Sequence, residues 1–424
     1  MSEDFLHYIW KFKQFDLSGL CTTDNEPVEI LKAGEHNFDA GPDFFNAKLR
    51  IGETLWAGNV EVHIKASDWN RHGHQTDKAY DNIILHAVYD ADHDLKRSTG
   101  EKIPTIEMKS RIPLKHFQKY MNFKQSKDWI PCEKQIKEVP DLIVNGMLDK
   151  MVLERLEKRS IHISNSLKLN HNNWEETFYQ ALARNFGFKT NADTFELLAK
   201  SLPSLIPAKQ KSSFLQVEAL IFGQAGMLEE HYKDKYPISL QNEYVFLQKK
   251  FQLQPLPIHL WKYLRLRPIN FPSIRLAQFA SLIYHSSNLF SSILERENLN
   301  DMKALFDITV SEYWETHYTF DKSSKMRSKR MGDEASNNII MNTIVPFLFV
   351  YGKQKAEEEH IERALRLLEQ LPGESNTIIS NWKNLGINVN SAQNTQALLQ
   401  LKNEYCQNKK CLNCNIGNYI LKNS

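Results

Sequence analysis

The N-terminal fold is decided by a stretch between residues 41 and 90. It opens with GPDFFNAKLRI (41–51), turns at Gly52-Glu53, continues as TLWAGNVEVHIKASDW (54–69) and closes with NRHGHQTDKAYDNIILHAVYD (70–90). Turn residues between β-rich runs are typical of a hairpin. The stretch therefore predicts two antiparallel strands followed, after a polar connection, by a third strand that is apolar on both faces except for His86.

Polar side chains recur along the second strand of this stretch. Apolar residues alternate there with Glu61, His63 and Lys65. Successive side chains of a strand point to opposite faces, so these three share one face and the apolar residues occupy the other. A hairpin through Gly52-Glu53 returns Asp43 toward the Glu61 end of this polar row.

Outside this stretch the predicted secondary structure changes once, from mainly strands to helices. An amphipathic helix is expected over 3–14, and short β-rich runs continue to residue 112. After Pro140 almost every segment has the i, i+3/i+4 apolar spacing of helices. The sequence therefore predicts an α+β protein, with a mixed-sheet domain and flanking helices over 1–135 and a larger all-helical domain over 136–424.

Composition indicates a globular protein. The 424 residues carry a net charge of +2 and are 42% hydrophobic, which is enough for a sizeable core but gives no global argument for nucleic acid. No run of 18 apolar residues occurs, so a cytoplasmic protein without membrane spans is expected. Nothing in the sequence indicates an oligomeric state.

The polar row suits metal-dependent hydrolysis. Carboxylates such as Asp43 and Glu61 are preferred ligands of Mg²⁺ or Mn²⁺, and a bound cation eases the deprotonation of water. His63 or Lys65 then stands ready to orient or deprotonate that water. The alternative is an ordinary solvated strand face.

These residues resemble the PD-(D/E)xK nuclease fold. Pro42-Asp43 and, beyond the hairpin, Glu61 match its motif. The resemblance implies a divalent-metal site at Asp43 and Glu61 and cleavage of DNA or RNA. The chain departs from the pattern at the residue two after the glutamate, where His63 replaces the usual lysine and Lys65 comes two positions later.

A group of histidines follows the same strand. The secondary candidates His72 and His74, Asp77 and His86 lie within a short span after His63. Imidazoles with carboxylates suit Zn²⁺ or Mn²⁺ better than Mg²⁺. The loop holding His72 and His74 can swing toward His63, although surface loop histidines and a hydrogen-bonded core histidine are equally ordinary explanations.

Cysteines near the C-terminus form a second candidate metal site. Cys406, Cys411 and Cys414 fall within YCQNKKCLNC, and Cys132 at the domain boundary is the natural fourth ligand. Thiolates in this arrangement suit Zn²⁺ or an iron–sulfur cluster, while ordinary reduced thiols remain the alternative. Some nucleases of the resembled fold are similar in holding an iron–sulfur cluster with one distant cysteine and a C-terminal group, with different spacing.

Two basic segments in the helical part are candidates for nucleic-acid contacts. Lysine and arginine clusters supply the phosphate contacts of such binding, although a solvated face is the simpler explanation. The candidate residues are Arg265, Arg267 and Arg275 in the first segment and Lys325, Arg327, Lys329 and Arg330 in the second.

Over nearly its full length the chain also resembles an uncharacterised bacterial protein family. The resemblance is carried by segments such as GNVEVHIKASDW, EALIFGQAGML, RLRPINFPSIRLAQFA and KKCLNCNIG, and it implies no activity. The resulting hypothesis is a metal-dependent nuclease. The alternatives are a non-catalytic nucleic-acid-binding or scaffold protein on the same fold and a zinc-dependent hydrolase of a small substrate.

Overall fold

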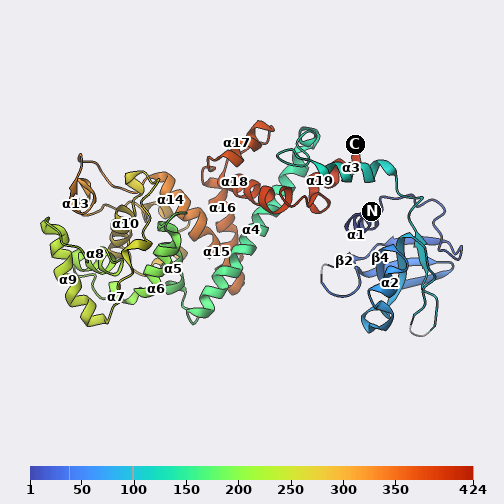
Figure 1. Ribbon diagram of the computed structural model, residues 1–424, viewed down its shortest axis with the longest axis horizontal. Coiled ribbons are helices and arrows are strands. Elements are labelled where there is room, and N and C mark those ends of the chain that lie inside the picture. Colours follow the sequence, from blue (N-terminus) through green and yellow to red (C-terminus); the bar gives the residue numbers. More distant parts are fainter. Residues whose placement is uncertain (38, 98–99, 424) are drawn as a thin grey trace. The chain divides into compact units, whose positions relative to one another are not determined.

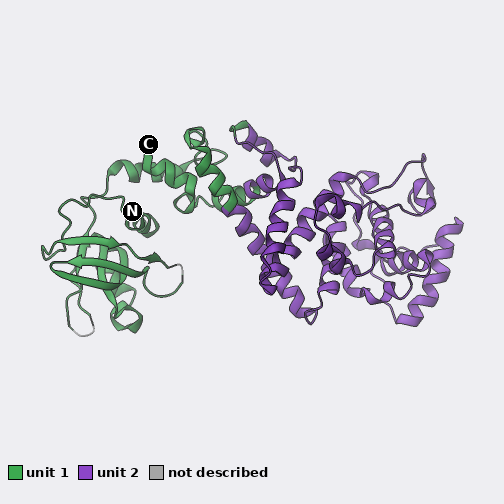
Figure 2. Cartoon of the chain, turned by 180° about the vertical axis from the view of Figure 1, so that it is seen from behind, with its two compact units in different colours: residues 1–149, 384–386, 399–424 green, residues 150–383, 387–398 purple. Residues whose placement is uncertain are grey.

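The computed structural model describes the whole chain except residues 38, 98–99 and 424. It divides into two compact units (Figure 2): unit 1 comprises 1–149, 384–386 and 399–424, and unit 2 comprises 150–383 and 387–398. The division falls within the long helix α4 (Asp141–Leu169). The cysteine-containing C-terminal segment thus belongs with the N-terminal residues, whereas the sequence-based boundary at 135/136 groups it with the helices.

The core of unit 1 is a six-stranded mixed sheet (Figure 1). Strands β3 and β4 form the expected antiparallel hairpin, with Phe44 opposite Val60, and β5 runs parallel to β4, with Glu61 opposite His86. The α+β class predicted from the sequence is therefore confirmed. The strands, which pair in the order β1-β3-β4-β5-β6 with β2 attached to β3, are β1 (Val28–Lys32), β2 (Glu35–His36), β3 (Phe44–Ile51), β4 (Thr54–Lys65), β5 (Ile83–Asp90) and β6 (Thr105–Glu107).

Strand β4 does not have the ordinary solvated face that was the alternative to a site along its polar row. Both faces are buried from Val60 to His63, and only 4% of Glu61 and 2% of His63 is exposed. The reason is that β4 lies between β3 and β5 and is also contacted by helices α1 (Glu3–Lys11) and α2 (Asp68–Arg71). Only the outer end of the polar row, Lys65, is exposed.

The crossover from β4 to β5 is a compact set of short helices. It consists of α2, η1 (His74–Thr76) and η2 (Lys78–Tyr80). Gly73, with φ +79°, joins α2 to η1 in a left-handed conformation that glycine adopts without strain. Trp69 and Ala66 anchor the crossover in the apolar core beside β5.

The remainder of unit 1 contains helices that are far apart in sequence. They are α3 (Leu114–Gln125), η3 (Ile136–Glu138), the π-helical turn η7 (Leu401–Cys406), η8 (Cys411–Asn413) and α19 (Asn415–Asn423). Helix α19 packs on α3 and η8. The Nζ atoms of Lys402 and Lys409 donate to the carbonyls of Trp129 and Lys124 at 2.5 and 2.6 Å, so these segments are held together by charged hydrogen bonds.

Unit 2 is helical apart from the hairpin of β7 (His317–Thr319) and β8 (Lys322–Ser323). Helices α8 and α10 are buried nearly all round and form its centre. None of the helices in the described residues is long and apolar enough to cross a membrane. Besides the second part of α4, its helices are α5 (Trp174–Phe186), α6 (Ala192–Ser201), α7 (Leu205–Ala208), α8 (Phe214–Gln224), α9 (Lys235–Phe251), η4 (Ile258–Leu260), η5 (Pro268–Asn270), α10 (Pro272–His285), α11 (Leu289–Glu295), α12 (Leu299–Ala304), α13 (Glu312–Glu315), α14 (Asp333–Ile339), η6 (Ile340–Ile344), α15 (Val345–Lys355), α16 (Glu358–Gln370), α17 (Thr377–Asn384) and α18 (Ala392–Gln400).

Candidate metal centre

The hairpin brings Asp43 and Glu61 together. The backbone N–H of Asp43 donates to Glu61 Oε2 at 3.1 Å, and the N–H of Val62 donates to Asp43 Oδ2 at 3.0 Å. The Glu61 carboxylate is thus held by the backbone of Asp43, and the Asp43 carboxylate by the backbone of Val62, the residue after Glu61. Burial raises the pKa of Glu61, and the negative charge of Asp43 adds to this effect.

Asp43 also contacts a residue from the N-terminal helix. His7 Nε2 of α1 lies 3.1 Å from Asp43 Oδ2. Burial opposes the charged form of both groups, but the contact between them outweighs burial, so the pKa of His7 is raised and that of Asp43 is lowered. His7 was not predicted as a site residue, because its contact with Asp43 depends on how α1 packs against the sheet.

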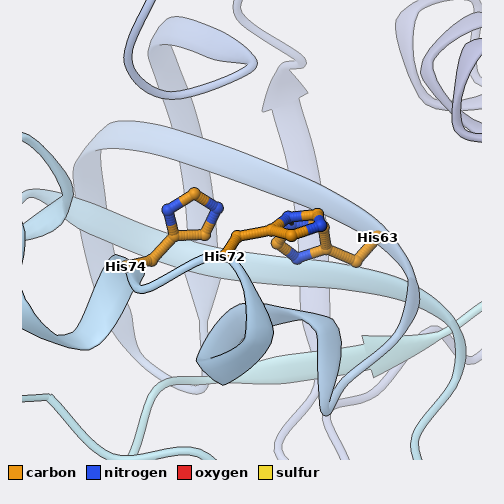
Figure 3. Close-up of side chains that lie close together, drawn as sticks. All are labelled: His63, His72 and His74. Carbon is orange, nitrogen blue, oxygen red and sulfur yellow. Dashed lines mark hydrogen bonds between the residues drawn. The ribbon is translucent and has the colours of Figure 1, made fainter.

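Glu61 Oε1 faces two imidazoles. It lies 3.3 Å from His74 Nε2 and 3.6 Å from His63 Nε2. His63 Nε2 in turn lies 3.1 Å from Nδ1 of His72. The loop histidines therefore reach the strand, and ligand atoms of all three histidines lie within 4.8 Å of one another (Figure 3).

These separations match the edges of a metal coordination shell. A tetrahedral ion with ligands at 2.0–2.1 Å holds neighbouring donor atoms about 3.3 Å apart. The mutually close donors belong to His63, His72 and His74, and the 3.1 Å between His63 Nε2 and His72 Nδ1 suits such an edge. Three imidazoles grouped in this way are able to hold one transition-metal ion, with the Glu61 carboxylate beside His63 and His74.

The protonation states of His63 and His86 favour metal binding. Burial lowers the pKa of His63 to about 4 and that of His86 well below its usual value, so both rings are neutral at physiological pH. His63 Nδ1 lies 2.8 Å from His86 Nε2. With its proton on Nδ1, His63 donates to His86 and keeps the Nε2 lone pair for a metal ion.

Aromatic side chains surround the imidazoles. Tyr80 stacks on His74 with 3.8 Å between ring centroids, and the Trp69 ring meets both His74 and His86 edge-on. Neither aromatic residue was expected at the site from the sequence, although both lie in the segment that connects β4 to β5. They fix His74 and limit the access of water to this side of the group.

A comparison with protein-family models matches residues 3–377 to the family described as "Protein of unknown function (DUF2851)". The chain belongs to this family. The predicted membership of an uncharacterised family is thereby confirmed, while the family description assigns no activity and leaves the nuclease resemblance unconfirmed. Searches of curated proteins and of solved structures found no match.

In this DUF2851 protein, two of the predicted site residues lie apart from the imidazoles. Lys65 is exposed at the end of β4, where its charge acts on Asp92. Asp77 caps η2, accepting a hydrogen bond from the N–H of Ala79 at 2.9 Å. His86, by contrast, is fully buried behind His63 and supports it from the neighbouring strand.

A cavity of about 500 Å³ opens beside Asp43. Its walls come from α1, the β2–β3 loop, α3 and the C-terminal segment, all within unit 1. His7 and Asp43 lie in the wall, together with the lysines Lys124, Lys409 and Lys410 and the aspartates Asp4 and Asp39. The cavity is thus lined by a histidine–carboxylate pair and by side chains of both charges.

The predicted basic segments of unit 2 divide into exposed and buried residues. Arg275 is buried, donates to Gln278 Oε1 and Asn270 Oδ1, and lies over the Phe188 ring. Lys329 is also buried, and its Nζ donates to two backbone carbonyls. Arg275 and Lys329 therefore make contacts within unit 2 itself. The other candidate residues of the two segments are exposed: Arg265, Arg267, Lys325, Arg327 and Arg330.

Proposed function

We propose that unit 1 is a metal-dependent hydrolase that cleaves phosphodiester bonds in nucleic acid. The observation that carries the proposal is the grouping of ligand atoms of His63, His72 and His74 within 4.8 Å of one another, with Glu61 Oε1 beside His63 and His74. Metal ions of this kind polarise phosphoryl oxygens and lower the pKa of bound water.

The donor set favours Zn²⁺ or Mn²⁺ over Mg²⁺. Mg²⁺ prefers oxygen ligands and retained waters, whereas imidazole nitrogens suit zinc and other transition metals. The expectation from the sequence, a cation held by Asp43 and Glu61 alone, therefore shifts toward Glu61 and the histidines. Asp43 remains beside the ion-binding group through its hydrogen bonds with the β4 backbone and Glu61.

In this proposal Asp43 and His7 handle protons. The 3.1 Å contact between them orients the imidazole, as carboxylate–histidine pairs do in acid–base catalysis. Both residues line the cavity, so a substrate bound there is within their reach. His7 is the candidate general acid for the leaving oxygen, a role for which the sequence offered no candidate.

The lysines in the cavity, rather than its net charge, support a phosphate-bearing substrate. Lys124, Lys409 and Lys410 line the same cavity as Asp43, and lysine is a common partner of phosphate. The exposed arginines and lysines of unit 2 are further candidate contacts for a nucleic-acid backbone.

The test combines metal binding with cleavage. Full-length protein, stripped of metal and reloaded with Zn²⁺, Mn²⁺ or Mg²⁺, is incubated with single- and double-stranded DNA and with RNA. We expect Zn²⁺ or Mn²⁺ to support cleavage, His74→Ala to lose both metal and activity, and Asp43→Asn to keep the metal but lose activity. His93→Ala changes an exposed histidine outside the group and serves as the control.

A zinc-dependent hydrolase of a small substrate is the second candidate. The observation in its favour is the cavity volume of about 500 Å³, which falls in the range of small-molecule sites. Cleavage of a small phosphodiester such as bis(4-nitrophenyl) phosphate, with all nucleic acids left intact, selects this candidate. Binding of metal and nucleic acid without cleavage of any substrate selects the non-catalytic alternative.

A further inference from the structure

A second group of metal-ligating side chains lies in unit 1, separate from the histidines. The four cysteines are Cys132, Cys406, Cys411 and Cys414, and all are present as thiols. Cys406 interacts electrostatically with the other three, and Cys132 does so with Cys411 and Cys414. Residues almost 280 positions apart in the chain thus bring their sulfurs into one neighbourhood.

Local backbone structure explains how three of the sulfurs converge. The π-helical turn η7 ends at Cys406, the N–H of Lys410 returns to the carbonyl of Tyr405 at 2.9 Å, and η8 begins at Cys411. The N–H of Cys414 then bonds to the carbonyl of Cys411. Two consecutive tight turns therefore keep the three cysteines of a nine-residue segment close enough to interact.

Contacts between the two segments bring Cys132 to this group. Lys402 lies one turn before Cys406, and Trp129 lies three residues before Cys132. The Nζ atom of Lys402 donates to the carbonyl of Trp129 and lies over the Trp129 ring. Exposed fractions of Cys132, Cys411 and Cys414 are 7–8%. Three of the four sulfur-bearing residues are therefore nearly withdrawn from water.

The charges around the group suit an anionic complex. Metal binding deprotonates cysteine ligands, and four thiolates leave net negative charge on the complex. Lys402 acts on Cys406, and Lys124 and Lys409 act on Cys411, in the direction that favours thiolates.

The distances between the sulfur atoms distinguish a site for a single zinc ion from a site for an iron–sulfur cluster. Four thiolates at 2.3 Å from one Zn²⁺ lie about 3.8 Å from one another. Among the described residues, the group of three donor atoms within 4.8 Å of one another is that of His63, His72 and His74. No three sulfurs of the described cysteines form such a group. An iron–sulfur cluster holds its thiolates further apart, because iron and sulfide stand between them.

We propose that Cys132, Cys406, Cys411 and Cys414 bind a four-iron iron–sulfur cluster that fastens the C-terminal segment to the N-terminal part of unit 1. Because it joins the region of Cys132 to the C-terminal segment, the cluster has a structural role: it fixes the segment that contains Lys409 and Lys410, which line the cavity. The inference does not depend on the proposed hydrolase activity, since the two groups share no ligand.

Full-length protein purified without oxygen tests this proposal. We expect a brown protein with broad visible absorption and about four iron and four acid-labile sulfide atoms per chain. Cys132→Ser and Cys411→Ser should each lose the visible absorption and most of the iron. Cys21→Ser should keep both, because Cys21 pairs with Pro27 at the edge of the sheet and belongs to no cysteine group.

Two results would overturn the proposal. One is a single zinc ion per chain with no sulfide, and the other is a chain that takes up neither iron nor sulfide during anaerobic reconstitution. The composition of the wild-type protein decides between these outcomes even where a serine variant fails to fold. A failure of nucleic-acid cleavage with iron and sulfide present would contradict the proposed function and leave this inference intact.

Discussion

His63 is held on both ring nitrogens by other imidazoles. His86 Nε2 lies 2.8 Å from Nδ1, and His72 Nδ1 lies 3.1 Å from Nε2. A ring supported in this way has one tautomer and one orientation available for a metal ion. The buried His86 therefore affects the metal centre without being a ligand of it.

His86→Phe tests this support. The phenyl ring fills much of the space but accepts no hydrogen bond, so we expect metal affinity to fall about 10- to 100-fold. Competition with a chromophoric chelator measures the affinity, and His93→Ala provides a histidine control at an exposed position. An unchanged affinity in the phenylalanine variant would show that His86 does not orient His63.

Glu218 predicts a pH dependence of stability in unit 2. It is 2% exposed, accepts a hydrogen bond from Ser311, and burial raises its pKa from 4.5 to about 7. The folded state therefore holds the proton more tightly than the unfolded state. The resulting stability is full below pH 4.5, falls by about 3 kcal/mol as the pH rises to 7, and is constant above that.

Glu218→Gln should remove this dependence, because glutamine keeps the acceptor oxygen but does not ionise. Urea unfolding of unit 2 between pH 4.5 and 7, followed for both proteins, measures the difference. Tyr236 and Ser311 face the carboxyl group, and neither titrates in this range. A slope that persists in the glutamine variant would assign the dependence to another group.

At the scale of elements, alternation and turn residues predicted the β3–β4 hairpin and the bounds of β4 closely. They did not predict that Glu61 and His63 would be buried, because burial depends on β5, α1 and α2, which lie elsewhere in the chain. His72 and His74 were recognisable because they share a short connection with β4. His7 was not, since only the packing of α1 brings it to Asp43.

Gly417 allows α19 to approach η8. A Cβ at this position would lie 2.3 Å from the carbonyl oxygen of Cys411, and a backbone atom cannot move aside as a flexible side chain can. We expect Gly417→Ala to destabilise unit 1 by about 1–3 kcal/mol. Thermal unfolding measures the loss.

Gly146→Ala is the matched control for this substitution. It lies in α4, where an added Cβ meets nothing within 4 Å, and alanine is favoured over glycine in a helix by up to about 1 kcal/mol. The control should therefore be neutral or stabilising. Equal destabilisation by the two substitutions would contradict a close contact at Gly417.

At the scale of the whole molecule, helical periodicity identified the large second part but not the return of the chain to unit 1. Residues 399–424 have the same helical spacing as the residues before them, so periodicity alone assigns them to the helical part. The cysteines supplied the signal that periodicity lacked, because three in one segment suggested a metal site with Cys132 as a distant fourth ligand. Cys132 was the residue that linked the two parts of unit 1.

The division into two units predicts where a metal ion at the histidines stabilises the protein. A ligand at 100 times its Kd stabilises the state that binds it by about 2.7 kcal/mol. Because the three proposed histidine ligands lie in unit 1, amide hydrogen exchange on adding Zn²⁺ or Mn²⁺ should slow in β4 and β5. Exchange in α8 and α10 of unit 2 should not change.

His74→Ala is the control for the exchange experiment, because it removes one ligand and should abolish the protection in β4 and β5. The same variant separates specific binding from general effects of the added salt. Protection of α8 to the same extent as β5 would mean that the two units open together. Binding at the histidines would then stabilise the whole chain as one cooperative body.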